Sequence, residues 1–109
     1  MLDESIVESV QAYLRHLRKE GLAVSFGVVF GSHATGAATE WSDIDLLVVS
    51  PKFDEPITRE DVNHLWHVAA RVDARIEPVP CGERQWEEDT TRAIVEIARR
   101  EGQRVAAAA

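Results

Sequence analysis

Two aspartates one residue apart, Asp43 and Asp45, stand in the otherwise apolar segment DIDLLVV. Because side chains alternate between the two faces of a strand, we expect both carboxylates on one face, about 6.5–7 Å apart along the chain. Two carboxylates this close repel one another unless a cation lies beside them. Mg²⁺ prefers carboxylate oxygens and keeps positions open for waters or phosphates, so the pair predicts a magnesium site.

A Gly-Ser pair, Gly31-Ser32, follows the apolar run 23–30. Glycine allows a ligand to approach the backbone closely, and the amides of a helical turn that begins at Ser32 favour a bound phosphate. Each feature alone is common, since a Gly-Ser pair is usually a turn and Asp-x-Asp often lies at a surface edge. Together they indicate transfer of a phosphate-bearing group from a metal-bound nucleotide.

The order Gly-Ser, ten residues, then Asp-x-Asp resembles the minimal nucleotidyltransferases of the DNA polymerase β-like superfamily. Gly31, Ser32, Asp43 and Asp45 occupy the four signature positions, and the resemblance covers nearly the whole chain. It implies an α/β (α+β) two-layer sandwich, in which a small mixed sheet has helices packed mainly on one face. It also implies Mg²⁺ held by the two aspartates and a third carboxylate from a neighbouring strand.

Glu77, in the segment RIEPV, is our candidate for the third carboxylate. The family often has aspartate there, and glutamate adds one methylene of reach. Its implied role is to bind metal or to deprotonate the attacking hydroxyl, which makes Asp43, Asp45 and Glu77 the candidate catalytic and metal-binding set. Asp73, at a predicted helix–strand junction, is the rival, and an ordinary solvent-facing strand residue is the alternative interpretation of Glu77.

The sequence departs from the family at Thr35, where many members carry a basic residue that neutralises triphosphate charge. His33 is the only nearby basic candidate, although an ordinary surface histidine at a helix start is the simpler interpretation. Arg75, one strand over, is another possible substitute. Ser42, beside the first aspartate, joins Gly31 and Ser32 as a candidate nucleotide-binding residue.

Hydrophobic periodicity places these residues on alternating helices and short strands. Helices are predicted over 3–20, from a capping box at 58–61 to about 72, and over 83–100, with one or two helical turns within 32–38. Strands are predicted over 23–30, 43–50 and 74–79, the last near an edge because Pro78 cannot donate to a ladder. Residues 103–109 are predicted as a short strand or a frayed tail.

The composition bounds the class of protein. A length of 109 residues fits a single domain, 1–109, and a formal charge of −7 argues against DNA or RNA as a partner. The chain's start lacks a basic segment followed by an apolar one, and its apolar runs are too short to span a bilayer. One cysteine, Cys81, cannot form an internal disulfide, which predicts a cytoplasmic protein. The short apolar runs predict that the chain does not enter a membrane.

Other reactive or aromatic residues have simpler interpretations. His64 and His67 are predicted as partly exposed helix residues and Cys81 as an inert thiol. Trp66 and Trp86 fall on predicted inner helix faces, and Trp41 is available to stack on a base or to pack on its loop.

The function that follows is a Mg²⁺-dependent nucleotidyltransferase that moves NMP, most simply AMP from ATP, to a hydroxyl acceptor and releases pyrophosphate. The resemblance implies a HEPN-type helical partner in a toxin–antitoxin pair, with this chain as the antitoxin that adds AMP to a tyrosine of the toxin. One alternative is a non-catalytic binding module that neutralises such a partner by complex formation. Another is a subunit of an antibiotic- or sugar-directed transferase, completed by a second domain or a homo-oligomer.

Overall fold

A mixed β-sheet organises the protein, and the computed structural model describes residues 2–39 and 41–107 of it. In the described ranges the sheet order is β3-β2-β1-β4, with β1 antiparallel to both β2 and β4 and with β2 parallel to β3. Along the chain the elements are α1 (Glu4–Lys19), β1 (Phe26–Phe30), α2 (Ser32–Thr35), β2 (Ile44–Val49), the 3-10 helix η1 (Pro51–Asp54), α3 (Arg59–Val72), β3 (Ile76–Cys81), α4 (Glu83–Glu88), α5 (Ala93–Glu101) and β4 (Gln103–Ala106).

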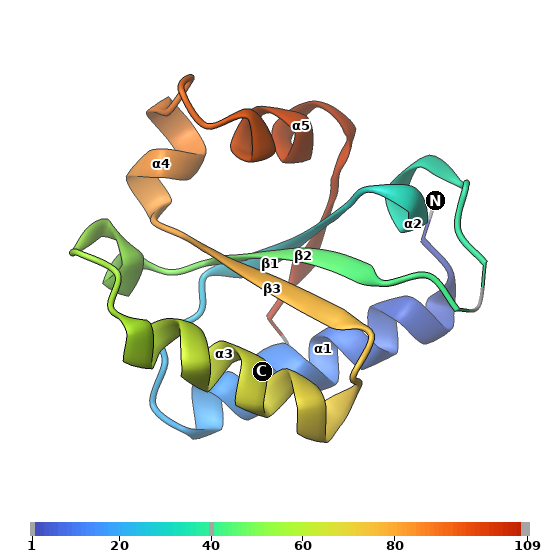
Figure 1. Cartoon of the computed structure of the whole chain (residues 1–109), viewed down its shortest axis with the longest axis horizontal. Coiled ribbons are helices and arrows are strands. Elements are labelled where there is room, and N and C mark those ends of the chain that lie inside the picture. The colour runs from blue at the N-terminus through green and yellow to red at the C-terminus, as the bar shows by residue number, and fades with distance from the viewer. Residues whose placement is uncertain (1, 40, 108–109) are drawn as a thin grey trace.

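Alternation along β2 divides the core between the two sheet faces. Ile44, Leu46 and Val48 pack with buried residues of α1 and α3, whereas Leu47 and Val49 pack with buried residues of α5. In Figure 1, α1 and α3 lie below the sheet and α4 and α5 lie above it. The predicted α/β fold with a small mixed sheet is confirmed. The two long helices share one face, and the short α4 and α5 cover part of the other.

The two long helices begin and pack as the sequence predicts. Asp3 caps α1 by accepting a hydrogen bond from the Ser5 amide at 3.0 Å, and Thr58 and Asp61 form the capping box of α3. Tyr13 of α1 donates its hydroxyl proton to the Leu65 carbonyl of α3 at 2.9 Å, within the buried interface. This bond satisfies a polar group inside the core and fixes the two helices relative to one another.

The predicted helix over 83–100 is wrong in one respect, because the chain breaks it into α4 and α5. Between them the Asp89 carboxylate accepts hydrogen bonds from both the amide and the hydroxyl of Thr91, each at 2.7 Å. Such local bonds from aspartate favour a turn over a continuing helix, and hydrophobic spacing alone does not reveal them. In α5, Ile97 is 36% exposed.

Trp66, predicted as a core residue, is instead 43% exposed. The buried stripe of α3 consists of Leu65, Val68 and Ala69, and Trp66 lies beside that stripe rather than on it. Trp86 packs on the second face of the sheet, as predicted. The third strand is an edge strand, as predicted. Of the predicted segment 103–109, Gln103–Ala106 form the strand β4, and residues 108 and 109 lie outside the described residues.

Across the described part of the chain, no helix has the length and apolar character needed to cross a membrane.

Candidate active site

The turn between β1 and α2 brings the two halves of the sequence motif into contact. Gly31 precedes α2 with φ 74° and ψ −150°, a conformation that residues with a side chain rarely adopt. A Cβ atom at Gly31 would lie 2.3 Å from Oδ2 of Asp45, so the backbone of the turn rests directly against that carboxylate. The Gly31-Ser32 turn and the Asp-x-Asp segment therefore form one site at the end of β1.

Three carboxylates gather at this end of the sheet. Asp45 lies opposite Glu77 in the parallel pairing of β2 with β3, so their side chains share a sheet face. Asp43 stands just before β2, close enough to Glu77 to raise the pKa of that carboxyl. The structure thus brings together the three acidic residues that the sequence singled out, from two neighbouring strands.

This gathering shows in the acid–base properties of the site. Burial, followed by repulsion from Asp43, raises the pKa of Asp45, and only the nearby His33 lowers it. The hydrogen bond to Asp43, then burial, then repulsion from Asp43 and Asp45, raises the pKa of Glu77. Negative charge is therefore concentrated at this end of the sheet, and a bound cation would relieve the repulsion.

The donor set fits Mg²⁺ in its chemistry, because hard cations take carboxylate oxygens. No three acidic, histidine or cysteine side chains within residues 2–39 and 41–107 already surround one metal position. An entering ion would therefore have to draw the three carboxylates around it.

Ser42 anchors the loop that leads into this segment. Its hydroxyl accepts a hydrogen bond from the Thr39 amide at 3.0 Å, and its own amide donates to the Thr39 carbonyl at 3.1 Å. Its carbonyl lies 3.2 Å from Nε2 of His33, a half-buried residue of α2. The link between His33 and Ser42 was not predicted, because a backbone acceptor has no residue type that a sequence motif could display.

This geometry agrees with comparisons to known proteins, since residues 10–101 match the family model of the nucleotidyltransferase domain. The chain belongs to this nucleotidyltransferase family. That confirms the resemblance drawn from the motif.

Two solved structures share the fold. One is a "putative nucleotidyltransferase" from Sulfolobus solfataricus, with 14% sequence identity and a TM-score of 0.62, over 90% of this chain and 77% of the other. The second is a toxin-antitoxin crystallised with AMP-PNP, with 16% identity and a TM-score of 0.63, over 94% of this chain and 73% of the other. The sequence matches none of the curated proteins.

In this nucleotidyltransferase domain, Asp73 and Glu77 have different surroundings. Asp73 ends α3 and pairs with Arg75, whose Nε and terminal nitrogen donate to the two carboxylate oxygens at 3.1 and 2.8 Å. The Arg75 side chain is the main cause that lowers the pKa of Asp73 to about 2. Asp73 therefore serves the helix–strand junction, whereas Glu77 faces the aspartates of β2.

The position where the family often carries a basic residue has an exposed threonine here. The Thr35 hydroxyl donates back to the Gly31 carbonyl at 3.3 Å, within its own short helix. Arg75, considered as a substitute, is engaged with Asp73. A pocket of about 310 Å³ lies beside these groups, and its lining consists of Asp3, Ser5, Ile6, His33, Gly36, Ala38, Thr39 and Arg75.

Trp41 does not pack on its loop, because 84% of it is exposed. Stacking of Trp41 on a base stays a prediction.

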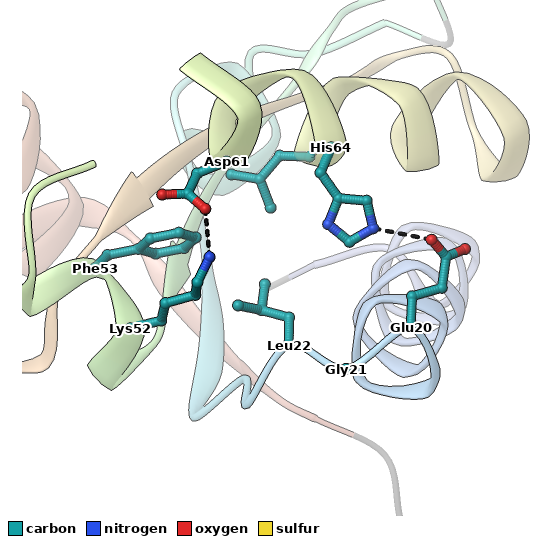
Figure 2. Close-up of a pocket in the computed structure, with 8 residues that line it drawn as sticks. Glu20, Gly21, Leu22, Lys52, Phe53, Asp61 and His64 are labelled. Atoms are coloured by element: carbon teal, nitrogen blue, oxygen red, sulfur yellow. Dashed lines mark hydrogen bonds and ion pairs between the residues drawn. The ribbon is translucent and has the colours of Figure 1, made fainter. Parts of the chain in front are cut away.

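A second, smaller pocket of about 130 Å³ lies at the opposite end of the sheet, after α1 and after β2 (Figure 2). Glu20 accepts from His64 at 2.9 Å on one side, and Lys52 contacts Asp61 at 2.5 Å on the other. His64 thus pairs with a carboxylate and is partly exposed, while His67 is exposed, as predicted. None of the predicted site residues lines this pocket.

Proposed function

We propose that residues 1–109 act as a single catalytic domain that transfers NMP, most simply AMP from ATP, to a hydroxyl acceptor with the help of Mg²⁺. The observation that carries the proposal is the convergence of three carboxylates beside a Gly-Ser turn whose backbone rests on one of them. Membership of the nucleotidyltransferase family supports the reaction class. Since ATP and Mg²⁺ are abundant in the cytoplasm, the proposal places the reaction there.

Each side chain has a role in this proposal. Asp43, Asp45 and Glu77 would hold Mg²⁺, which supplies positive charge that offsets the phosphate charge. Gly31 lets the triphosphate approach the backbone, and Ser32 offers its amide and its hydroxyl to the phosphate oxygens. Ser42, beside Asp43, would contribute further polar contacts to the nucleotide.

The reaction itself requires one proton transfer. The acceptor oxygen forms a bond to the α-phosphorus, the bond from that phosphorus to the bridging oxygen breaks, and pyrophosphate leaves. The hydroxyl proton passes to a nearby base. Glu77, which lies opposite Asp45 on the neighbouring strand, is the carboxylate that would take this proton if it does not itself bind the metal.

We further propose that the acceptor belongs to a partner protein, a HEPN-type helical toxin, for which this chain is the antitoxin. One structure with the same fold is a toxin-antitoxin with AMP-PNP, and the present chain spans 73% of that chain's length. A tyrosine hydroxyl of the partner would then receive AMP. The same surface would neutralise the partner by binding alone if the site were inactive.

The test combines the full chain, Mg²⁺, ATP labelled on its α-phosphate, and a HEPN-type protein encoded by a neighbouring gene. We expect label on the partner, lost in Asp43→Asn and in Asp45→Asn and retained in the control Asp73→Asn, whose carboxylate serves Arg75 instead. A stable complex without label transfer would favour the binding module. Label on a small hydroxyl compound in place of the partner would favour the antibiotic- or sugar-directed transferase.

A further inference from the structure

His33 links the two halves of the active-site motif through one hydrogen bond. Its Nε2 lies 3.2 Å from the carbonyl oxygen of Ser42, nine residues further along the chain and directly before Asp43. A carbonyl can only accept, so Nε2 must carry the hydrogen of this bond. The imidazole therefore donates from α2 to the segment that carries the aspartates.

The position of α2 depends on such contacts. A helix of four residues has too few internal hydrogen bonds to hold itself in place, and Gly36 ends it with φ 83°. On one side of the turn the Gly31 backbone rests on the Asp45 carboxylate. On the other side the His33 side chain bonds to Ser42. The Gly31-Ser32 turn is thereby fixed at two points against the segment 42–45.

His33 also influences the carboxylate of Asp45. Burial and Asp43 raise the pKa of Asp45, and His33 acts in the opposite direction. The imidazole thus lies near Asp45 as well as near Ser42. Thr35, where the family often has a basic residue, is exposed and bonded to its own helix.

We propose that His33 is a positioning residue that holds the Gly31-Ser32 turn in register with Asp43, so that the phosphates and the metal ion are bound as one unit. This inference rests on the function proposed above. Its consequence is a coupling: Mg²⁺ should tighten the binding of the nucleotide, and the nucleotide should tighten that of Mg²⁺. Loss of the His33 hydrogen bond should therefore reduce the affinity for the nucleotide more in the presence of Mg²⁺ than in its absence.

The experiment measures the affinity of the full chain for AMP-PNP by calorimetry, with saturating Mg²⁺ and with EDTA. In His33→Met, which removes the donor at similar size, we expect about a tenfold loss of affinity with Mg²⁺ and less than about threefold in EDTA. In His33→Gln, which keeps an N–H donor of comparable reach, we expect affinity within about threefold of wild type in both conditions. His67→Met, the same change at an exposed position of α3, is the matched control and should match wild type.

Several outcomes would overturn the inference. An equal loss of affinity with and without Mg²⁺ in His33→Met would overturn this inference and leave the proposed function standing. A failure of His33→Gln to restore binding would do the same. A wild-type chain that binds no AMP-PNP in either condition overturns the proposed function as well. Nitrogen NMR of labelled histidine provides an independent readout: a hydrogen on Nε2 of His33 is expected, and a neutral ring protonated only on Nδ1 would contradict the bond.

Discussion

Gly31 and Asp45 approach so closely that only a hydrogen atom fits between them on the glycine side. A Cβ atom at Gly31 would lie 2.3 Å from Oδ2 and 3.3 Å from Cγ of Asp45. The backbone there also has φ 74°, which disfavours a side chain on conformational grounds alone. The glycine of the motif is thus required by its own backbone and by the carboxylate beside it.

We therefore predict that Gly31→Ala costs about 2–3 kcal/mol of unfolding free energy and lowers transfer more than about a hundredfold, because Asp45 must move. Gly21→Ala is the control, since Gly21 has φ 102° and open space around it. That variant should lose only the backbone cost, about 1 kcal/mol, and keep its activity. Urea unfolding and a transfer assay measure both, and full activity in Gly31→Ala would contradict the prediction.

Substitution of Glu77 and of Asp73, the two candidates for the third carboxylate, should have different effects on transfer. Because Glu77 faces Asp45 across the strand pair, Glu77→Gln should reduce transfer about a hundredfold or more while the fold is kept. Because Asp73 bonds to Arg75, Asp73→Asn should stay within about threefold of wild type in the same assay. A reversed order of the two variants would assign the role to Asp73.

Repulsion among the three carboxylates should also make the metal-free protein less stable than a variant in which one of them is replaced by a neutral amide. Asp43→Asn removes one of the charges that repel Asp45 and Glu77, so we expect a gain of about 0.5–1 kcal/mol without metal. The same variant should gain less stability from added Mg²⁺ than wild type does, because it has lost a ligand. Thermal unfolding with EDTA and with Mg²⁺ measures both effects. Equal shifts with Mg²⁺ in the two proteins would argue against a metal site here.

Much of this fold could be predicted from the sequence because its signals are local. The apolar runs predicted the inner strands, and the capping box at residues 58–61 predicted the start of α3. The short-range pattern of Gly31, Ser32, Asp43 and Asp45 indicated the site. The register that places Glu77 opposite Asp45 depends on long-range strand pairing, which local patterns do not specify.

Other features were missed for similar physical reasons. The His33 bond ends on a backbone carbonyl, which every residue possesses. The break after α4 results from hydrogen bonds within 89–91 that compete with helical ones. Trp66 was misplaced because hydrophobicity alone cannot tell the centre of a helix stripe from its margin.

Two tryptophans provide a test of which aromatic side chains stabilise the fold. Trp41 is 84% exposed, so Trp41→Ala should change the unfolding free energy by less than about 0.5 kcal/mol. Trp86 packs on the second face of the sheet and meets the Phe26 ring edge-on, with centroids 5.7 Å apart. Trp86→Ala should therefore cost about 2–3 kcal/mol. Urea unfolding of both variants measures the difference, and similar costs would contradict the packing described here.

The Asp73–Arg75 pair predicts how stability depends on pH. The Arg75 side chain lowers the pKa of Asp73 to about 2, well below its ordinary value of 3.8. The folded state therefore holds this carboxylate charged where the unfolded chain begins to protonate it, and the stabilisation is present above about pH 4 and is lost as the pH falls towards 2. Asp73→Asn should be less stable than wild type by about 1–2 kcal/mol at pH 7, and this difference should shrink steadily below pH 4. Urea unfolding of both proteins from pH 7 to pH 2.5 measures the difference, with Asp3→Asn as a control for an exposed capping carboxylate at the surface. A difference that stays constant over this range would show that the carboxylate stabilises the junction by its shape and neutral hydrogen bonds rather than by its charge.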